Sequence, residues 1–150
     1  MNMEKTFIRV RSFKDIVVFV SLAIVGIVLT VLPIGEPANI AGFFIIMTAA
    51  ILAFILKSAY KDVETNKMYF RKERYFQKAE HETILSAIAS KPCSVDLTLE
   101  DKGNGLRLDI YYSKSSGKAY LQLFEYIPYT YQPCSKVYEH EISKVDKLIK

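Results

Sequence analysis

One long stretch of this chain carries almost no charge. Residues 16–56 occupy 41 positions with a single charged residue, Glu36, whereas the rest of the chain has 20 Lys/Arg and 15 Asp/Glu. A soluble domain spreads its apolar residues over many elements, and neither a disordered chain nor a disulfide-rich miniprotein has such a block. This distribution excludes those three classes and predicts a membrane protein.

The uncharged stretch is too long for one membrane span. A helix of 41 residues would be roughly 60 Å long, whereas the hydrocarbon core of a bilayer is about 30 Å thick. Pro33, Gly35 and Pro37 lie near the middle of the stretch, and such residues interrupt helices. We therefore expect a transmembrane hairpin over residues 15–57, with spans of about 15–33 and 38–57 and an outer turn at 34–37.

The start of the first span has two informative features. Ser12 and Asp15 have the spacing of a capping box, which marks a helix N-terminus. A cleaved signal peptide is the alternative reading of this span. Its 20 uncharged residues are long for a signal core, and no small-residue cleavage site follows at once.

Lys and Arg residues predict how the hairpin is oriented. Residues 1–14 contain four of them, the turn contains none, and residues 57–78 contain seven. Positively charged flanks stay in the cytoplasm. We therefore expect a protein integral to the cell (inner) membrane with both termini cytoplasmic, a basic cytoplasmic N-terminal segment over residues 1–14 and a cytoplasmic domain over residues 58–150.

The composition of the two spans limits what the hairpin does. Neither span contains Asp, Glu, Lys, Arg or His, and transport paths normally need such groups inside the membrane. Small residues suit close contact between helices, and the positions with this spacing are Gly26, Thr30, Ala38, Gly42, Ala49 and Ala53. Packing of the two spans against each other explains them, and a homo-oligomer is the alternative.

The cytoplasmic domain is expected to be α+β. Apolar and polar residues alternate in three segments that we interpret as half-buried strands of an antiparallel meander, residues 94–100, 106–112 and 118–126. Tight turns at residues 101–105, which include Asn104-Gly105, and at residues 113–117 would join them. The fold class is a two-helix transmembrane hairpin followed by a small α+β domain, an antiparallel sheet covered on one face by two short helices.

The remaining segments of the domain are less regular. Two prolines make residues 127–133 an edge strand or an ordered loop. Residues 66–76 are interpreted as a strand, with a helical extension of the second span as the alternative. The two short helices are expected over residues 78–90 and from about Glu139 to the end.

The residues that most often carry chemistry are few. Cys93 and Cys134 lack CxxC spacing and should stay reduced in the cytoplasm. His81 and His140 each lie in a Glu-His-Glu triplet, which lacks the ligand spacing of a zinc site. We therefore expect no metal, no cofactor and no catalytic residue, and an enzyme that uses this Cys/His set is a minor alternative.

Two sets of residues are candidates for binding. Basic residues after the second span would contact anionic lipid headgroups, although the positive-inside rule alone also explains them; they are Lys57, Lys61, Lys67, Arg71, Lys72 and Arg74. Aromatic residues near Pro128 and Pro133 form the second set. They suit a protein interface, or else they form a local cluster that closes the core. They are Phe124, Tyr126, Tyr129, Tyr131 and Tyr138.

These features favour a non-enzymatic binding or regulatory module that the hairpin anchors at the inner membrane face. Its expected partners are the lipid bilayer and a protein of unknown identity, with no nucleic acid. The first alternative is an immunity (self-protection) protein against a membrane-active toxin, which rests on size and architecture alone. The second alternative is a membrane-surface enzyme.

Overall fold

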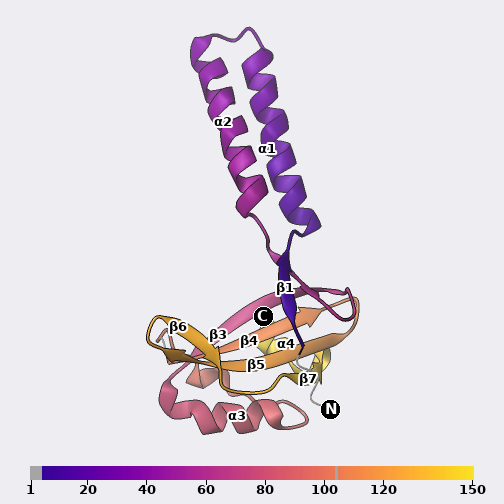
Figure 1. Cartoon of the computed structure of the whole chain (residues 1–150), viewed down its shortest axis with the longest axis vertical. Coiled ribbons are helices and arrows are strands. Elements are labelled where there is room, and N and C mark those ends of the chain that lie inside the picture. The colour runs from indigo at the N-terminus through magenta and orange to yellow at the C-terminus, as the bar shows by residue number, and fades with distance from the viewer. Residues whose placement is uncertain (1–4, 104) are drawn as a thin grey trace. The chain divides into compact units, whose positions relative to one another are not determined.

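The chain divides into two compact units in a computed structural model that describes residues 5–103 and 105–150 (Figure 1). One unit comprises residues 9–59. The other comprises residues 5–8 together with the described residues from 60 to 150. Residues 5–8 therefore share a compact unit with the domain that follows the hairpin.

The first unit is a helical hairpin. Helix α1 (Phe13–Val31) and helix α2 (Glu36–Ile55) lie side by side (Figure 1). The chain reverses between them at Gly35, whose φ of +132° suits a residue without a side chain, and Pro37 lies in the first turn of α2. Both helices are long and apolar enough to cross a membrane, so the expected pair of helices and its turn are confirmed.

The open end of the hairpin is held by hydrogen bonds. The expected capping box is present, because Ser12 Oγ accepts from Asp15 N and Asp15 Oδ2 accepts from Ser12 N at 2.8 Å. The same Asp15 Oδ2 accepts from Ser58 N at 2.8 Å, and the Ser12 and Ser58 hydroxyls are 2.9 Å apart. The cap of α1 therefore also fixes the chain that leaves α2.

Glycine allows the two helices to approach closely at one level. A Cβ atom on Gly42 would lie 2.7 Å from the Gly26 carbonyl oxygen and 2.7 Å from the Thr30 nitrogen. A Cβ atom on Gly26 would lie 2.9 Å from the Gly42 carbonyl oxygen. All three distances are shorter than van der Waals contact, so α1 and α2 can pack this way only with glycine at these positions.

The second unit is built on an antiparallel sheet. Within the described residues the sheet has seven strands in the order β1-β2-β3-β4-β5-β6, and β7 pairs with β5 beside β6. The strands are β1 (Phe7–Val10), β2 (Ala59–Asp62), β3 (Met68–Phe76), β4 (Leu106–Ser113), β5 (Lys118–Ile127), β6 (Thr130–Pro133) and β7 (Tyr138–Glu141).

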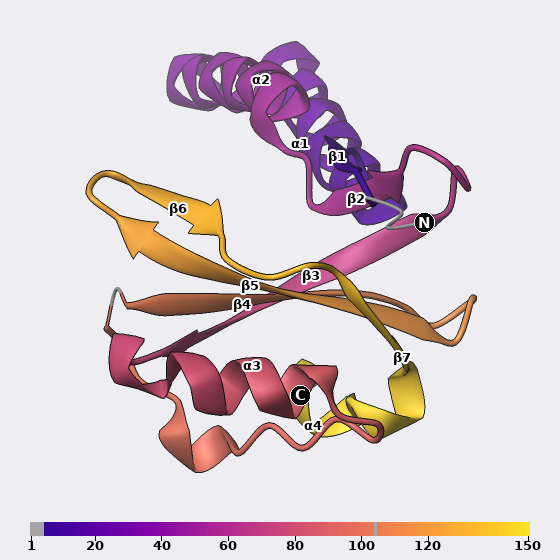
Figure 2. The ribbon, with the colours of Figure 1, turned by 60° about the horizontal axis from the view of Figure 1, so that its bottom comes forward.

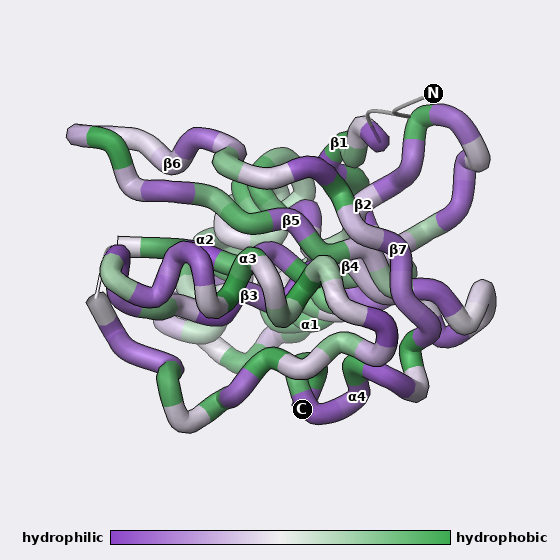
Figure 3. Tube along the Cα trace, turned by 90° about the horizontal axis from the view of Figure 1, so that it is seen from below, coloured by the Kyte–Doolittle hydropathy of each residue, from purple (hydrophilic) through white to green (hydrophobic). Residues whose placement is uncertain are grey.

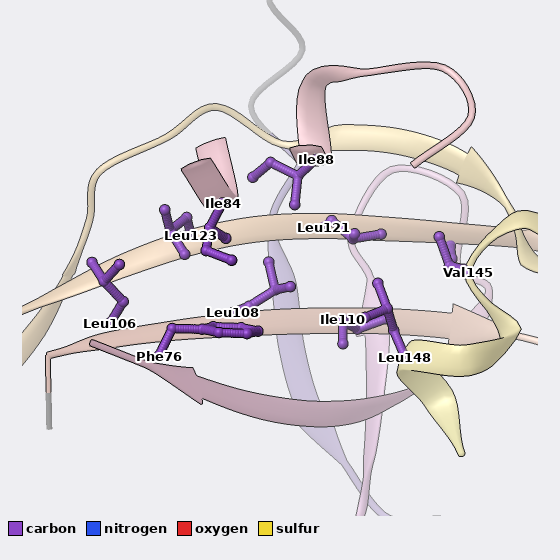
Figure 4. Packing of buried hydrophobic residues seen from close by; sticks show 11 residues of the cluster. Phe76, Ile84, Ile88, Leu106, Leu108, Ile110, Leu121, Leu123, Val145 and Leu148 are labelled. Atoms are coloured by element: carbon purple, nitrogen blue, oxygen red, sulfur yellow. The ribbon is translucent and has the colours of Figure 1, made fainter. Parts of the chain in front are cut away.

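Helices α3 (His81–Ala89) and α4 (Asp146–Ile149) cover one face of this sheet (Figure 2). Figure 3 shows hydrophobic and hydrophilic residues interleaved along β5. Its alternate residues Ala119, Leu121 and Leu123 lie in the core under the helices. Figure 4 shows the resulting core, whose buried members are Phe76, Ile84, Ile88, Leu106, Leu108, Ile110, Ala119, Leu121, Leu123, Val145 and Leu148. We call this side of the sheet the helix face.

Several expectations are confirmed. The strands expected over residues 106–112 and 118–126 are β4 and β5, joined by a turn at Gly117, whose φ is +65°. Residues 68–76 of the segment 66–76 form strand β3 and not a helical extension. The segment 127–133 contains edge strand β6, and residues 78–90 contain α3.

Two predictions for the domain were wrong. Residues 94–100 form no strand but a 3-10 turn over Leu97–Leu99, because the Asp96 side chain accepts from Thr98 N at 2.9 Å and bends the chain. The final segment is not helical from Glu139, because Tyr138–Glu141 pair with β5 as strand β7 before α4 begins. The expected turn at Asn104-Gly105 includes Asn104, which lies outside the described residues.

Candidate functional site

The face of the sheet opposite the helices carries aromatic and charged side chains. Because side chains alternate along a strand, the residues between the core positions of β4 point to this face, and they are Arg107, Asp109 and Tyr111. Their cross-strand neighbours on β3 and β5 share the face. We call the end of this face that holds Tyr75, Arg107, Phe124, Tyr126 and Tyr131 the arginine patch.

Aromatic rings hold Arg107 at the centre of the patch. Its guanidinium carbon lies 4.9 Å from the centroid of Phe124 and 4.4 Å from that of Tyr131. Tyr131 in turn contacts Tyr126 at 5.2 Å and Tyr75 edge-on at 6.4 Å between ring centroids. Cation–π contacts of this kind fix the rings as well as the cation, so the patch presents a preformed surface.

A buried carboxylate lies beside this arginine. Asp109 has 1% of its side chain exposed, with Arg107 Nε 2.9 Å from its Oδ1 and Arg71 Nε 3.6 Å from its Oδ2. Arg107 Nε and Asp109 Oδ1 are close but not aligned as a hydrogen bond. Burial raises the pKa of Asp109 above its usual range, although both arginines oppose this shift.

The loop between β5 and β6 lies at the end of the patch and carries an exposed tyrosine. Tyr129 is 98% exposed and has a φ of +74°, a conformation that costs a residue with a side chain about 1 kcal/mol or more. Backbone strain of this kind persists when the surrounding structure imposes it. The tight β5–β6 pairing, from Ile127 with Thr130 onwards, imposes it here.

The outer edge of β6 is poorly suited to pairing with a partner strand. Cys134 N donates to Leu123 O at 3.0 Å, so alternation turns the N–H groups of Gln132 and Thr130 toward β5 as well. The outward positions are then Tyr131 and Pro133, and proline has no N–H. The edge of β6 therefore offers few free N–H groups to an added strand.

A cavity opens beside the arginine patch. Its volume is about 750 Å³, and its lining comprises Tyr75, Leu97, Glu100, Asp101, Lys102 and Tyr131. Arg74 pairs with Glu100 at 3.1 Å and holds that wall in place. The cavity combines two aromatic rings with charged residues of both signs.

The other end of this face holds a second aromatic cluster, which we call the tyrosine cluster: Tyr60, Tyr69, Tyr111 and Tyr120. Phe7 stacks on Tyr111 with ring centroids 4.1 Å apart and planes 6° from parallel. The Phe7 ring also meets Tyr69 edge-on at 5.5 Å. Burial raises the pKa of Tyr111 to about 12.

The chain before Phe7 is anchored beside this cluster. Lys5 Nζ is 2.8 Å from Asp62 Oδ2, and the Asp62 side chain is fully buried. The same Nζ lies 4.7 Å from the Tyr120 ring centroid, and Thr6 O accepts from Val63 N at 3.1 Å. The sequence analysis did not find this contact; the alternation of Lys5, Phe7 and Arg9 with apolar or β-branched residues was the available signal.

The structure divides the expected partner-binding residues. Phe124, Tyr126 and Tyr131 lie together in the arginine patch, and Tyr129 lies at its end. Tyr138 pairs with Leu121 and packs against the core of the helix face, with Lys136 Nζ 5.3 Å from its ring. Tyr138 therefore does not belong to the same surface as the other four.

The expected lipid-binding residues are divided in a similar way. Arg71 contacts Glu73, Asp109 and the Tyr60 hydroxyl. Arg74 donates to Leu148 O at 3.0 Å as well as to Glu100. Side chains engaged in such contacts stabilise the domain, which leaves the exposed lysines Lys57 and Lys67 as the freer members of that set.

The cysteines and histidines occupy separate structural roles. His140 Nε2 is 2.7 Å from Ile88 O, Cys134 Sγ donates to Leu123 O, and both thiols are free. Burial raises the pKa of both thiols, which weakens them as nucleophiles. Within the described residues, no three His, Cys, Asp or Glu side chains are placed to hold a metal ion.

Comparison with known proteins adds no relative. No protein-family model, no curated protein and no solved structure matches this chain. The hairpin, the arginine patch and the tyrosine cluster are therefore the features from which a function is inferred.

Proposed function

We propose that this protein is a non-enzymatic binding module that its helical hairpin anchors in the cell membrane. The observation that carries the anchoring is the exposure of the two helices. Only 11% of the most apolar 18-residue window of each helix is buried, and large side chains such as Phe43, Phe44 and Phe54 are more than half exposed. An apolar surface of this size needs a cover, and lipid provides it for helices of this length.

Two features support a cytoplasmic position for both ends of the hairpin. Basic residues near the open end of the helices are Arg9, Arg11, Lys14 and Lys57, whereas the turn carries only Glu36. Residues 5–8 also share one compact unit with the domain after α2. Thr6 O accepts a hydrogen bond from Val63 N there, which supports a position of both flanks of the hairpin on the same side of the bilayer.

A labelling experiment tests the anchor and its orientation. In a Cys93→Ser/Cys134→Ser background, single cysteines replace Ile34 in the turn and Lys14 at the open end. In intact cells, a membrane-impermeant maleimide should label the residue-34 cysteine and spare the residue-14 cysteine. Labelling of both before lysis, or release of the protein from membranes by alkaline carbonate, would refute the anchor.

The proposed binding surface is the arginine patch, and its partner is a protein that reaches the same membrane face. Arginine and tyrosine are the residue types that most often dominate such interfaces, and tethering raises the effective concentration of a weak partner. Exposed Lys57 and Lys67 would add contacts to anionic lipids.

Photocrosslinking tests this surface. A photoreactive amino acid at Tyr129 should give one defined crosslinked partner in membranes. Tyr131→Ala should abolish that product, whereas Lys114→Ala, an exposed change on the β4–β5 turn, should leave it intact. Crosslinking that survives Tyr131→Ala would exclude the patch as the binding surface.

A further inference from the structure

The tyrosine cluster already shows what kind of ligand it accepts. Its occupant is an extended segment of the same chain, in which Lys5 and Phe7 point to the sheet while Thr6 and Ile8 are exposed. Side chains two residues apart share one side of an extended strand. The tyrosine cluster therefore binds a segment that has a cation at one position and an aromatic ring two positions later.

Lys5 and Phe7 each contact a part of the site that would otherwise lack a partner. Asp62 has no exposed surface, and its carboxylate would be buried without a cationic partner if Lys5 left. The rings of Tyr69, Tyr111 and Tyr120 all contact Phe7 within 5.9 Å between centroids. Without an aromatic occupant these rings would face water on that side.

The occupant lies at the edge of the sheet. Phe7 begins strand β1, which ends the strand order and, within the described residues, pairs with β2 alone. Lys5 and Thr6 precede this strand and are joined to the domain by the Asp62 ion pair, the Tyr120 ring contact and the hydrogen bond from Val63. An extended edge segment with one neighbouring strand is placed to be exchanged for another extended segment of the same chemistry.

We propose that the tyrosine cluster is a peptide-binding site for an extended segment with a basic residue and an aromatic residue two positions later. The chain's own residues 5–7 fill this site when no partner is bound, and a partner protein that carries such a segment displaces them. This proposal is separate from binding at the arginine patch, because it involves other residues at the other end of the sheet face.

Peptide binding to the full-length protein in lipid nanodiscs tests the proposal. The probe is a fluorescent peptide of residues 4–9, EKTFIR, followed by anisotropy. A Lys5→Ala/Phe7→Ala protein should bind it, and the wild-type protein should bind at least about tenfold more weakly because its own segment must leave first. A peptide with alanine in place of the phenylalanine, or glutamate in place of the lysine, should fail to bind.

Two further variants make the result decisive. Tyr111→Ala in the emptied protein should abolish peptide binding, whereas Lys114→Ala should not change it. In a Cys93→Ser/Cys134→Ser background, a disulfide between Thr6→Cys and Val63→Cys, formed with copper phenanthroline, should block binding until it is reduced. Equal binding by the wild-type protein and the Lys5→Ala/Phe7→Ala protein would overturn the proposal. Binding to the disulfide-locked protein would also overturn it. The proposal would equally be wrong if the peptide bound neither the Lys5→Ala/Phe7→Ala protein nor the reduced protein.

Discussion

The ion pair beneath the arginine patch should couple Arg107 to Asp109 strongly. The two side chains are 17% and 1% exposed, and the closest pair of atoms is 2.9 Å apart. Removing one member of a buried pair costs about 3–5 kcal/mol because the other charge is left without a partner. Arg71, which lies 3.6 Å from Asp109, reduces this loss, so we expect Arg107→Ala to lower the free energy of unfolding by about 2–3 kcal/mol.

A double-mutant cycle measures the coupling directly. Arg107→Ala, Asp109→Ala and the double variant are unfolded with urea as full-length proteins in detergent micelles. Near-UV circular dichroism follows the tyrosines, and all ten lie after residue 59, so the signal reports the sheet domain. The double variant should be more stable than the sum of the single losses predicts, by about 1–3 kcal/mol.

A surface pair on the neighbouring strands provides the matched control. Lys118 and Glu139 also form an ion pair, but their side chains are 51% and 49% exposed. Solvent screening limits such pairs to less than about 1 kcal/mol. If the Arg107–Asp109 cycle gave a coupling no larger than this control, the burial argument for the patch would be wrong.

The hairpin and the N-terminal segment offer two more tests. Gly42→Leu should destabilise the hairpin by about 1–3 kcal/mol in an SDS unfolding titration because the new side chain overlaps α1. Ala41→Leu, on the exposed side of α2, is the control and should change the stability little. Equal effects of the two substitutions would contradict the close helix contact. Burial favours the neutral form of Asp62, but its hydrogen bonds, first of all from Lys5, outweigh burial and lower its pKa. The stability from ionised Asp62 is therefore complete above the usual value of 3.8 and is lost as the pH falls through the lowered pKa. Protection of the Val63 amide against hydrogen exchange, relative to its intrinsic rate at each pH, should fall over that acid range in the wild-type protein. A pH-independent ratio of exchange rates between wild type and Asp62→Asn would refute this link.

Local patterns predicted the elements whose packing is local. Strands β4 and β5 alternate because each has one apolar face on the helices, and the break between α1 and α2 follows from Gly35 and Pro37. The same alternation failed at residues 94–100. Val95, Leu97 and Leu99 also contact the core. Leu97 and Leu99 reach it from a 3-10 turn and Val95 from the irregular segment before it, and alternation cannot distinguish this arrangement from a strand.

The candidate sites depended on contacts that no local pattern contains. The aromatic residues of the arginine patch were identifiable by composition, but their separation from Tyr138 required the register of β5 with β6 and β7. Lys5 and Asp62 are 57 positions apart in sequence, with the whole hairpin between them. Four residues of strand β1 are too few to predict such a partner from periodicity.

The N-terminal contact also explains why this domain suits an anchor with two spans. Lys5 and Phe7 precede α1 but belong to the folded unit that follows α2. If each helix crosses the membrane as proposed, the two crossings place Asp62 and the tyrosine cluster on the same side of the membrane as Lys5 and Phe7. A single crossing would leave Phe7 on the opposite side and Asp62 buried without its cation. The fold of the domain and the number of spans are thus not independent features, because the sheet face is complete only when both ends of the hairpin lie together.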